Sequence, residues 1–514
     1  MAKYGSFKYS EAMYGYTDPG RRLSWGLLID WFDNGFVSGY NEAYGYNQNE
    51  HKLFELNAKA GRQYFMNSSG NGFQSVDPSR MQAQLYDMGG RYDPYNMSGP
   101  LYQNILPGKK FKLIVRDEVN SVTYPIMTGR IDDIRPNYGS VSTVTITGIN
   151  GIDDLQNITV NTTQVYTSEK YYDAIAQVLT RAGWSGGSRI DSDISDELPY
   201  WWLSGKTAYQ EITDLTEASR GLFFVSHDGY ATYYSNINSM DSVASFVDND
   251  ALLSYGIRVP TPWEAIKNFV RVYAKARRTS TGTLWTLQSK PLILAGTSIT
   301  IWAEGSNVNG ETTPALSVTT PVATTDYTAN SAEDGSGTNL TANISIALTS
   351  YATTQKLVIS NTGGTNAYLT LMQLRGTSIV SDDYTYYETS DTDSIALYRQ
   401  RELSVKTNWL QSINDAEDYA NTIVSLLAEP KKFPRFVVRN KPAKQFAPDI
   451  FDIVSVDFES RQLTGSFRVG YIEHNWTIKT GDIVDTTFYL EPNIAGNISG
   501  TWTFPAVFNL STIF

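Results

Sequence analysis

An approximate internal repeat, with its copies about 340 residues apart, constrains the fold of this chain more than any other feature. In each copy a proline stands a few residues before an apolar run that is typical of a β-strand, and a glycine follows 22 residues after that proline. Each glycine opens a Gly-x-Ile sequence, which precedes a turn and a strand of alternating polarity. The matching positions are Pro107, Gly129 and Ile131 in the first copy and Pro448, Gly470 and Ile472 in the second. The pattern predicts two pseudo-repeated antiparallel β-barrels; the alternative is a chance similarity among short strands.

Composition favours a mainly β protein that makes extensive interfaces. A chain of 514 residues is longer than one hydrophobic core usually serves, so several domains are expected. Aromatic residues make up 13% of the chain and include 34 Tyr. Tyr is favoured in half-buried strands and at wet interfaces, because its ring is apolar and its hydroxyl makes hydrogen bonds.

Strand, helix and turn signals divide the chain into six parts. Two helical periodicities followed by a hairpin around Asp228-Gly229 indicate a small α+β domain, and weakly charged strands rich in Ser, Thr and Asn indicate a sandwich. We expect an aromatic N-terminal arm at 1–24, a first β-barrel at 25–160, the α+β domain at 161–260, a second β-barrel at 261–282 and 391–493 with a helix at 415–428, an inserted immunoglobulin-like (Ig-like) β-sandwich at 283–390, and an aromatic C-terminal tail at 494–514.

Aromatic residues at both ends of the chain are candidates for partner interfaces. Exposed aromatic side chains are costly unless another surface covers them. The alternatives are a loose terminus for the N-terminal arm and packing on the chain's own barrel for the tail. The candidates are Tyr4, Tyr9, Tyr14 and Tyr16 in the arm and Trp502, Phe504, Phe508 and Phe514 in the tail.

Charge and residue usage exclude several classes of function. The net charge of −12 argues against a general nucleic-acid binder, although DNA passing through an acidic or neutral channel is compatible with it. The chain has no Cys, so it forms no disulfide framework and no thiolate metal site. Its N-terminal residues lack the apolar run of a signal peptide, and no stretch approaches ~20 apolar residues, so we expect synthesis in a cytoplasm.

The sequence shows no catalytic motif, and we expect no enzyme, cofactor or metal. Asp191 and Asp193 suggest a cation site, but a solvated loop is the favoured interpretation because further ligands at suitable spacing are missing. Trp201-Trp202 suggest sugar stacking, yet covering the core of the helical domain is favoured. Asp132-Asp133 adjoin on a strand and therefore point to opposite faces. His474 is expected to pack in a core or an interface.

Several motifs along residues 25–493 resemble the tail hub, or tail tip, proteins of siphophages. The first barrel is represented by Gly61-Arg62, Gly89–Asn96, Pro107-Gly108 and Gly129–Ile134, the sandwich by Thr325–Asn330 and Asp334–Gly337, and the second barrel by Asp449–Val454 and Phe467–Ile472. One departure is Asp87–Gly90, which replaces the usual Asn-Asp-Gly-like turn of the family.

The resemblance implies a homotrimer similar to the hub of the T-even baseplate, with two barrels per chain in a pseudo-sixfold ring. It also implies a virion protein at the distal tip of the tail, made in the host bacterial cytoplasm, which closes the tail tube and opens for genome delivery. The implied partners are a hexameric distal tail ring, the tape measure protein, and fibre or receptor-binding proteins, with DNA only as transient channel cargo. The sandwich is expected to lie at the periphery, where it meets a fibre or the host surface. The alternative function is a carbohydrate-binding adhesin or depolymerase.

Overall fold

The computed structural model describes residues 23–36, 42–44, 53–62, 76–87, 89–192, 197–235, 241–252, 256–305, 312–477 and 483–493. Residues 1–22 of the aromatic arm and the whole tail at 494–514 lie outside these ranges. All eight terminal aromatic residues proposed for partner interfaces are therefore outside the described residues: Tyr4, Tyr9, Tyr14, Tyr16, Trp502, Phe504, Phe508 and Phe514.

A curled 12-stranded sheet forms the centre of the molecule. We call β1–β7 the first half of the sheet and β13 with β25–β28 the second half. The first half contains β1 (Leu23–Ile29), β2 (Glu42–Tyr44), β3 (Leu53–Gly61), β4 (Arg80–Tyr86), β5 (Lys110–Asp117), β6 (Val122–Asn137) and β7 (Thr143–Asn150). The second half contains β13 (Ala244–Val247), β25 (Arg435–Arg439), β26 (Ile453–Phe458), β27 (Leu463–Thr477) and β28 (Val484–Pro492).

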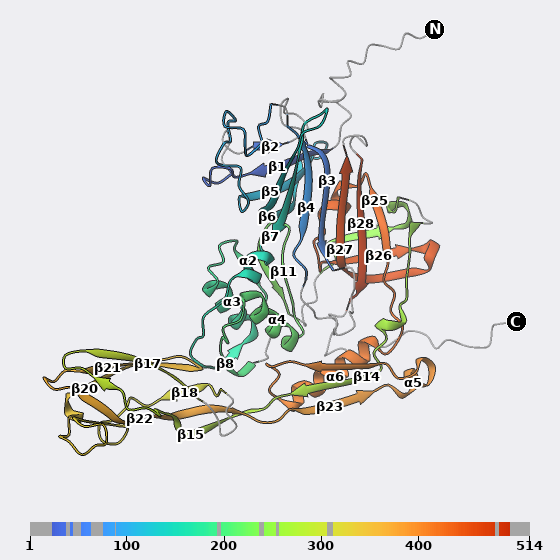
Figure 1. Cartoon of the computed structure of the whole chain (residues 1–514). Coiled ribbons are helices and arrows are strands. Elements are labelled where there is room, and N and C mark those ends of the chain that lie inside the picture. Colours follow the sequence, from blue (N-terminus) through green and yellow to red (C-terminus); the bar gives the residue numbers. More distant parts are fainter. Residues whose placement is uncertain are drawn as a thin grey trace, which may run out of the picture.

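The two halves join through one antiparallel ladder. Strand β27 pairs with β3 from Tyr471 opposite Gly61 to Thr477 opposite Glu55, so the two halves share one sheet (Figure 1). Each half keeps a core of its own, with Leu, Ile and Trp side chains in the first and a cluster of Phe side chains in the second. Trp476 on β27 lies in the first core, so the joint is packed as well as hydrogen-bonded.

The two repeat-bearing hairpins pair in the same register next to their turns. Val115 lies opposite Tyr124 in β5–β6, and Val456 lies opposite Gly465 in β26–β27, so both members of the second pair follow their counterparts by 341 residues. The two hairpins differ further from the turn: β5–β6 has a register shift between Leu113 and Ile114, which β26–β27 lacks, so Lys112 lies opposite Thr128 whereas Ile453 lies opposite Arg468.

Both repeat glycines lie where a side chain does not fit. A Cβ atom at Gly129 would lie 2.0 Å from the carbonyl oxygen of Ile149. At Gly470 it would lie 2.6 Å from the Glu491 side chain. Backbone and neighbours therefore approach closely at both positions.

An α+β body lies below the first half of the sheet in Figure 1. It contains α2 (Ile152–Asn157), β8 (Tyr166–Lys170), α3 (Tyr171–Arg181), β9 (Ser188–Ile190), β10 (Glu197–Trp201), α4 (Ala208–Ser219), β11 (Leu222–Val225) and β12 (Ala231–Tyr234). Thr207 and Gln210 close a capping box at the start of α4. Strands β11 and β12 form the hairpin expected around Asp228-Gly229.

Residues 261–282 and the helix expected at 415–428 do not join the second half of the sheet. Instead β14 (Phe269–Ala274), β23 (Thr385–Ser390) and β24 (Glu402–Lys406) form a separate sheet, accompanied by α5 (Thr392–Tyr398). Helix α6 (Ile413–Leu427) packs its apolar face on β14 and β23, with Ala416 and Ile423 buried against Val270 and Val272. The second half takes β13 instead, from the segment 161–260 that was expected to be α+β, because Phe246 fills its aromatic core.

The insertion consists of two sheets packed around a shared apolar core. It contains β15 (Arg277–Thr286), β16 (Leu292–Ile293), β17 (Ser298–Glu304), β18 (Ala315–Val318), β19 (Tyr327–Asn330), β20 (Ile344–Ser350), β21 (Thr354–Asn361) and β22 (Ala367–Ser381). The expected bounds of 283–390 are shifted, since β15 begins at Arg277 and β23 belongs to the small sheet. The β15–β22 ribbon carries this sandwich away from the curled sheet (Figure 1).

No helix among the described residues is both long and apolar enough to cross a membrane.

Removing the sandwich should leave the remainder folded. Gly282 and Gly376 are paired in the β15–β22 ribbon, and paired antiparallel Cα atoms lie roughly 4.5–5.5 Å apart, so a short Gly-Ser turn in place of residues 283–375 closes the chain. We expect a soluble protein with a cooperative melt, because the sandwich has its own core. Circular dichroism melting and gel filtration measure this. An insoluble product, or a melt without a cooperative transition, would show that the sandwich is part of the main folding unit.

Candidate functional site

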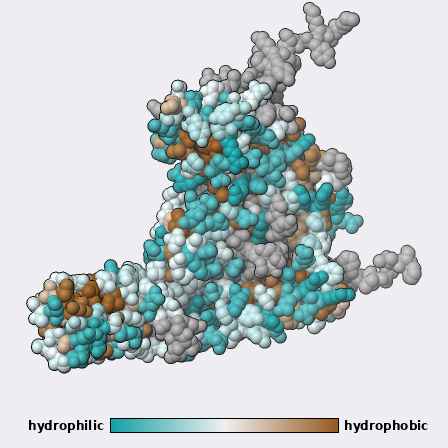
Figure 2. All heavy atoms as spheres, viewed as in Figure 1, coloured by the Kyte–Doolittle hydropathy of each residue, from teal (hydrophilic) through white to brown (hydrophobic). Residues whose placement is uncertain are grey.

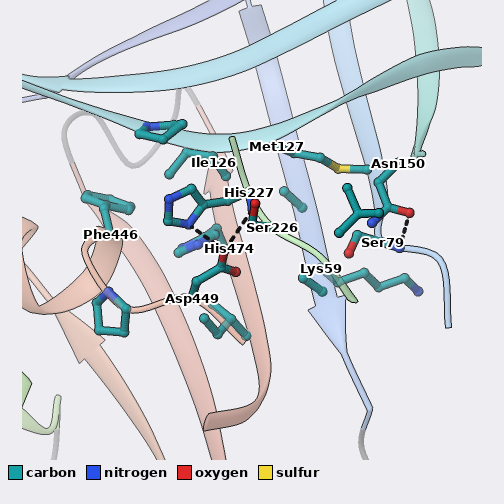
Figure 3. A pocket seen from close by; sticks show the side chains of 16 residues that line it. Lys59, Ser79, Ile126, Met127, Asn150, Ser226, His227, Phe446, Asp449 and His474 are labelled. Carbon is teal, nitrogen blue, oxygen red and sulfur yellow. Dashed lines mark hydrogen bonds and ion pairs between the residues drawn. The ribbon is translucent and has the colours of Figure 1, made fainter. Parts of the chain in front are cut away.

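A small internal cavity lies where the two halves of the sheet meet the α+β body (Figure 3). Its walls come from β3, β6 and β27, from the β11–β12 turn, and from the loop before β26. The volume is about 30 Å³. A cavity of this size holds about one water molecule and no organic substrate. The titratable groups around the cavity therefore serve first to connect the two halves of the sheet with the α+β body.

His227 and Asp449 connect the β11–β12 turn to the second half of the sheet. The backbone N–H of His227 donates to Asp449 Oδ2 at 2.8 Å, and the His227 Nδ1 atom lies 3.2 Å from the same oxygen (Figure 3). The backbone N–H of Asp449 in turn donates to Asp452 Oδ2 at 2.8 Å. Two backbone donors thus fix two carboxylates in a loop that contains no regular structure of its own.

Burial, together with the neighbouring charge of Asp449, raises the pKa of Asp452 to about 6. The N–H of Asp449 and the His227 ring act in the opposite direction. Carrying the charge on Asp452 therefore costs stability.

His474 lies on the second-half side of the same cavity, from β27. Its Nδ1 atom is 3.0 Å from the hydroxyl of Thr486, and its ring lies 5.3 Å from the Phe446 ring. Burial, with a smaller effect from His227, lowers the pKa of His474 to about 3. The imidazole is therefore neutral at physiological pH, and its position agrees with the packing role that the sequence favoured.

Arg62 and Glu491 form a buried ion pair at the end of the joint. Arg62 Nε donates to Glu491 Oε1 at 2.9 Å and Nη2 donates to Oε2 at 2.8 Å, so the contact is bidentate. The two residues are 429 positions apart in the sequence, and their side chains are only 7% and 5% exposed. Arg468, also buried, lies close to this pair, and burial lowers its pKa to about 10. Glu491 therefore faces two guanidinium groups in a low-dielectric site.

The repeat positions have different surroundings in the two halves. Pro107 is exposed before β5, whereas Pro448 lines the cavity. Ile131 and Ile472 are buried in the two separate cores. Gly470 accepts close contact from Gly61, whose φ of +94° belongs to the left-handed region that favours glycine.

The other candidates from the sequence do not form a common site. Trp201 is fully buried in the core of the α+β body, which rules out sugar stacking for that residue, and Trp202 packs edge-on against Trp409. The Asp191 carboxylate accepts from the N–H and hydroxyl of Ser235, while Asp193 lies outside the described residues. Within the described ranges no three acidic or His side chains are grouped to hold a metal ion.

Sequence reasoning missed Arg62, His227, Asp449, Asp452 and Glu491 as a group. Nothing local marks them, because they come from four distant parts of the chain and meet only after the halves pair. The Gly61-Arg62 motif was noticed only for its resemblance to the tail hub family, not as a partner of Glu491.

Neutralising Asp452 should stabilise the protein at high pH. The folded pKa of about 6 lies above the ordinary value of 3.8, so the charged form costs up to about 3 kcal/mol above pH 6 and nothing below pH 3.8. Asp452→Asn keeps an acceptor for the Asp449 N–H. We expect it to raise the free energy of unfolding by about 1–3 kcal/mol at pH 8 and to give almost no gain at pH 4.

Urea unfolding at the two pH values tests this. Asp418→Asn on the exposed face of α6 is the matched control and should have the same small effect at both. A clear loss of stability for Asp452→Asn at pH 8 would show that its charge is a favourable, paired one.

Comparisons with known proteins give a likeness of fold. No family model matches the chain, and no curated protein matches it. The tail protein from Neisseria meningitidis MC58 is similar in structure with a TM-score of 0.50 at 8% identity, over 92% of this chain and 97% of that one. The 43 kDa tail protein of prophage MuSo2 from Shewanella oneidensis gives a TM-score of 0.49 at 10% identity, over 92% and 99%. On the first of these likenesses, the chain shares the mostly β fold of that tail protein.

Proposed function

We propose that this chain is a structural virion protein, the trimeric hub at the distal end of a bacteriophage tail. The observation that carries the proposal is the pair of hairpins that share a register next to their turns, β5–β6 and β26–β27, held in a single continuous sheet. The fold that the chain shares with a tail protein supports the same class of function.

Symmetry explains why one chain would carry two similar halves. A hexameric distal tail ring presents six equivalent docking surfaces, and three chains match them by offering two surfaces each. Each half of the sheet, completed as a pseudo-repeated barrel, would meet one ring subunit. The α+β body, the small sheet with α6 and the sandwich have no second copy among the described residues, so below the ring they reduce the sixfold symmetry to threefold.

The remaining roles follow from that position. The hub closes the tail tube, contacts the tape measure protein from below, carries fibre or receptor-binding proteins, and opens to let DNA pass as transient cargo. Its work is assembly and gating, without catalysis. The sandwich, in this proposal an Ig-like accessory module, extends outwards to a fibre or the host surface.

A specific feature of the sandwich favours the second candidate, carbohydrate binding. Trp302 on β17 is 56% exposed and stacks on Tyr351, with ring centroids 6.3 Å apart and planes inclined by 24°. Figure 2 shows apolar surface gathered on this part of the molecule. A flat, exposed aromatic pair suits the apolar face of a sugar ring, so a glycan-binding adhesin is the alternative function.

Native mass spectrometry tests the trimer. The purified chain should appear at three times its mass of 57.3 kDa, and the trimer should persist on dilution because assembly buries the edges of the sheet. The sandwich-deleted protein should give the same stoichiometry, since the sandwich lies outside the proposed ring. A monomer at every concentration, with or without the sandwich, would contradict the proposal.

A further inference from the structure

A second hollow, an open cleft of about 460 Å³, separates the first half of the sheet from the α+β body. One wall is the outer face of strands β5 and β6. The other is built from the loop at residues 182–186 and the hairpin turn at Asp228–Tyr230. The cleft is much larger than the cavity at the joint and falls within the range of ordinary binding sites.

The strand wall of the cleft carries like charges in direct opposition. Lys110 on β5 lies opposite Arg130 on β6, and Lys112 lies opposite Thr128, so three cations occupy adjoining positions on one face. Like charges placed directly opposite each other destabilise a sheet. The arrangement is unexpected in a chain whose net charge is −12, and an anion bound between these side chains would relieve the repulsion.

The carboxylates of the cleft are already engaged. Asp154 accepts from Arg130 Nε at 3.0 Å, and Asp228 is paired with Arg189 and with the Ser226 hydroxyl. Lys112 lies 5.0 Å from the centre of the Phe36 ring, and Lys110 forms no ion pair within the described part of the chain. The charges of Lys110 and Lys112 therefore have no anionic partner among the described residues.

The opposite wall is held together by side-chain contacts and includes backbone amide groups. The indole N–H of Trp184 donates to the carbonyl of Gly187 at 2.7 Å, and the Tyr230 ring lies 4.1 Å below the guanidinium of Arg189. The amides of Ser185 and Gly186 donate to no other backbone group of the described residues. A wall of this kind suits an extended peptide, whose carbonyls would accept from those amides.

We propose that this cleft receives an acidic, extended segment of a neighbouring tail component, with Lys110 and Lys112 binding its carboxylates. The inference names a partner surface for the assembly role proposed above and rests on that role for the identity of the partner. A nucleic acid fits less well, because the acidic chain repels a long polyanion while a short peptide brings few charges.

The probe is a fluorescein-labelled peptide of four Glu-Thr repeats, titrated with the full-length chain and followed by fluorescence anisotropy. The neutral peptide of four Gln-Thr repeats and single-stranded dodecathymidylate are measured beside it. We expect the acidic peptide to bind at least about tenfold more tightly than either, and the affinity to fall as salt rises from about 50 to about 200 mM.

Two double variants distinguish binding in this cleft from nonspecific electrostatic attraction to the rest of the chain. Lys110→Gln with Lys112→Gln should weaken binding of the acidic peptide at least about tenfold while raising the melting temperature of the free chain, since the repulsion is removed. The control, Lys290→Gln with Lys432→Gln, removes two exposed lysines elsewhere and should leave binding unchanged.

Equal binding by the neutral peptide, or by the Lys110/Lys112 variant, would overturn the inference. Tighter binding of the oligonucleotide would overturn the assignment to a peptide. Native mass spectra are recorded on the same samples. A trimer that does not bind the acidic peptide refutes only this inference. A monomer that binds the peptide refutes only the proposed trimer.

Discussion

The ladder between β27 and β3 is the constraint on which the rest of the structure depends. It turns two similar hairpin units into one curled sheet, and it ends at a bidentate ion pair between Arg62 and Glu491. Burying that pair is costly, and its attraction in a dry site does not guarantee a net gain in stability. Removing one partner, however, would leave an uncompensated charge, which is strongly unfavourable. The pair therefore specifies which strands meet, more than it strengthens the fold.

The other bodies are attached at the lower end of that sheet. The α+β body is held through the His227–Asp449 contact and shares its core with Ile450 and Phe451 from the loop before β26. The small sheet with α6 contacts the α+β body through hydrogen bonds such as Tyr419 Oη to the Glu217 carbonyl, and Trp409, from the loop before α6, packs in the core of the α+β body. The sandwich is connected to the rest of the chain by the two-stranded β15–β22 ribbon.

The sequence predicted local structure well and partner choice poorly. The hairpin around Asp228-Gly229 and the shared register of β5–β6 and β26–β27 follow from turn residues and alternation, which are local signals. Helix α6 was placed at nearly the right residues but against the wrong sheet, because periodicity shows that Ala420 and Ile423 are buried without showing against what. Arg62 and Asp452 belong to motifs that resemble the tail hub family, but no local signal showed that they would meet, since their contacts form only when distant strands pair.

Cysteine cross-linking of the joint tests the central claim most directly, and the chain offers a clean background because it contains no Cys. Asn57 and Asn475 lie opposite each other in the ladder, with the Asn57 amide donating to the Asn475 side chain at 2.6 Å. Asn57→Cys with Asn475→Cys should therefore form a disulfide under mild oxidation in the folded protein. Asn57→Cys with Trp476→Cys should not, because neighbouring residues of a strand point to opposite faces. Cross-linking of the second pair alone, or of neither, would contradict the shared sheet.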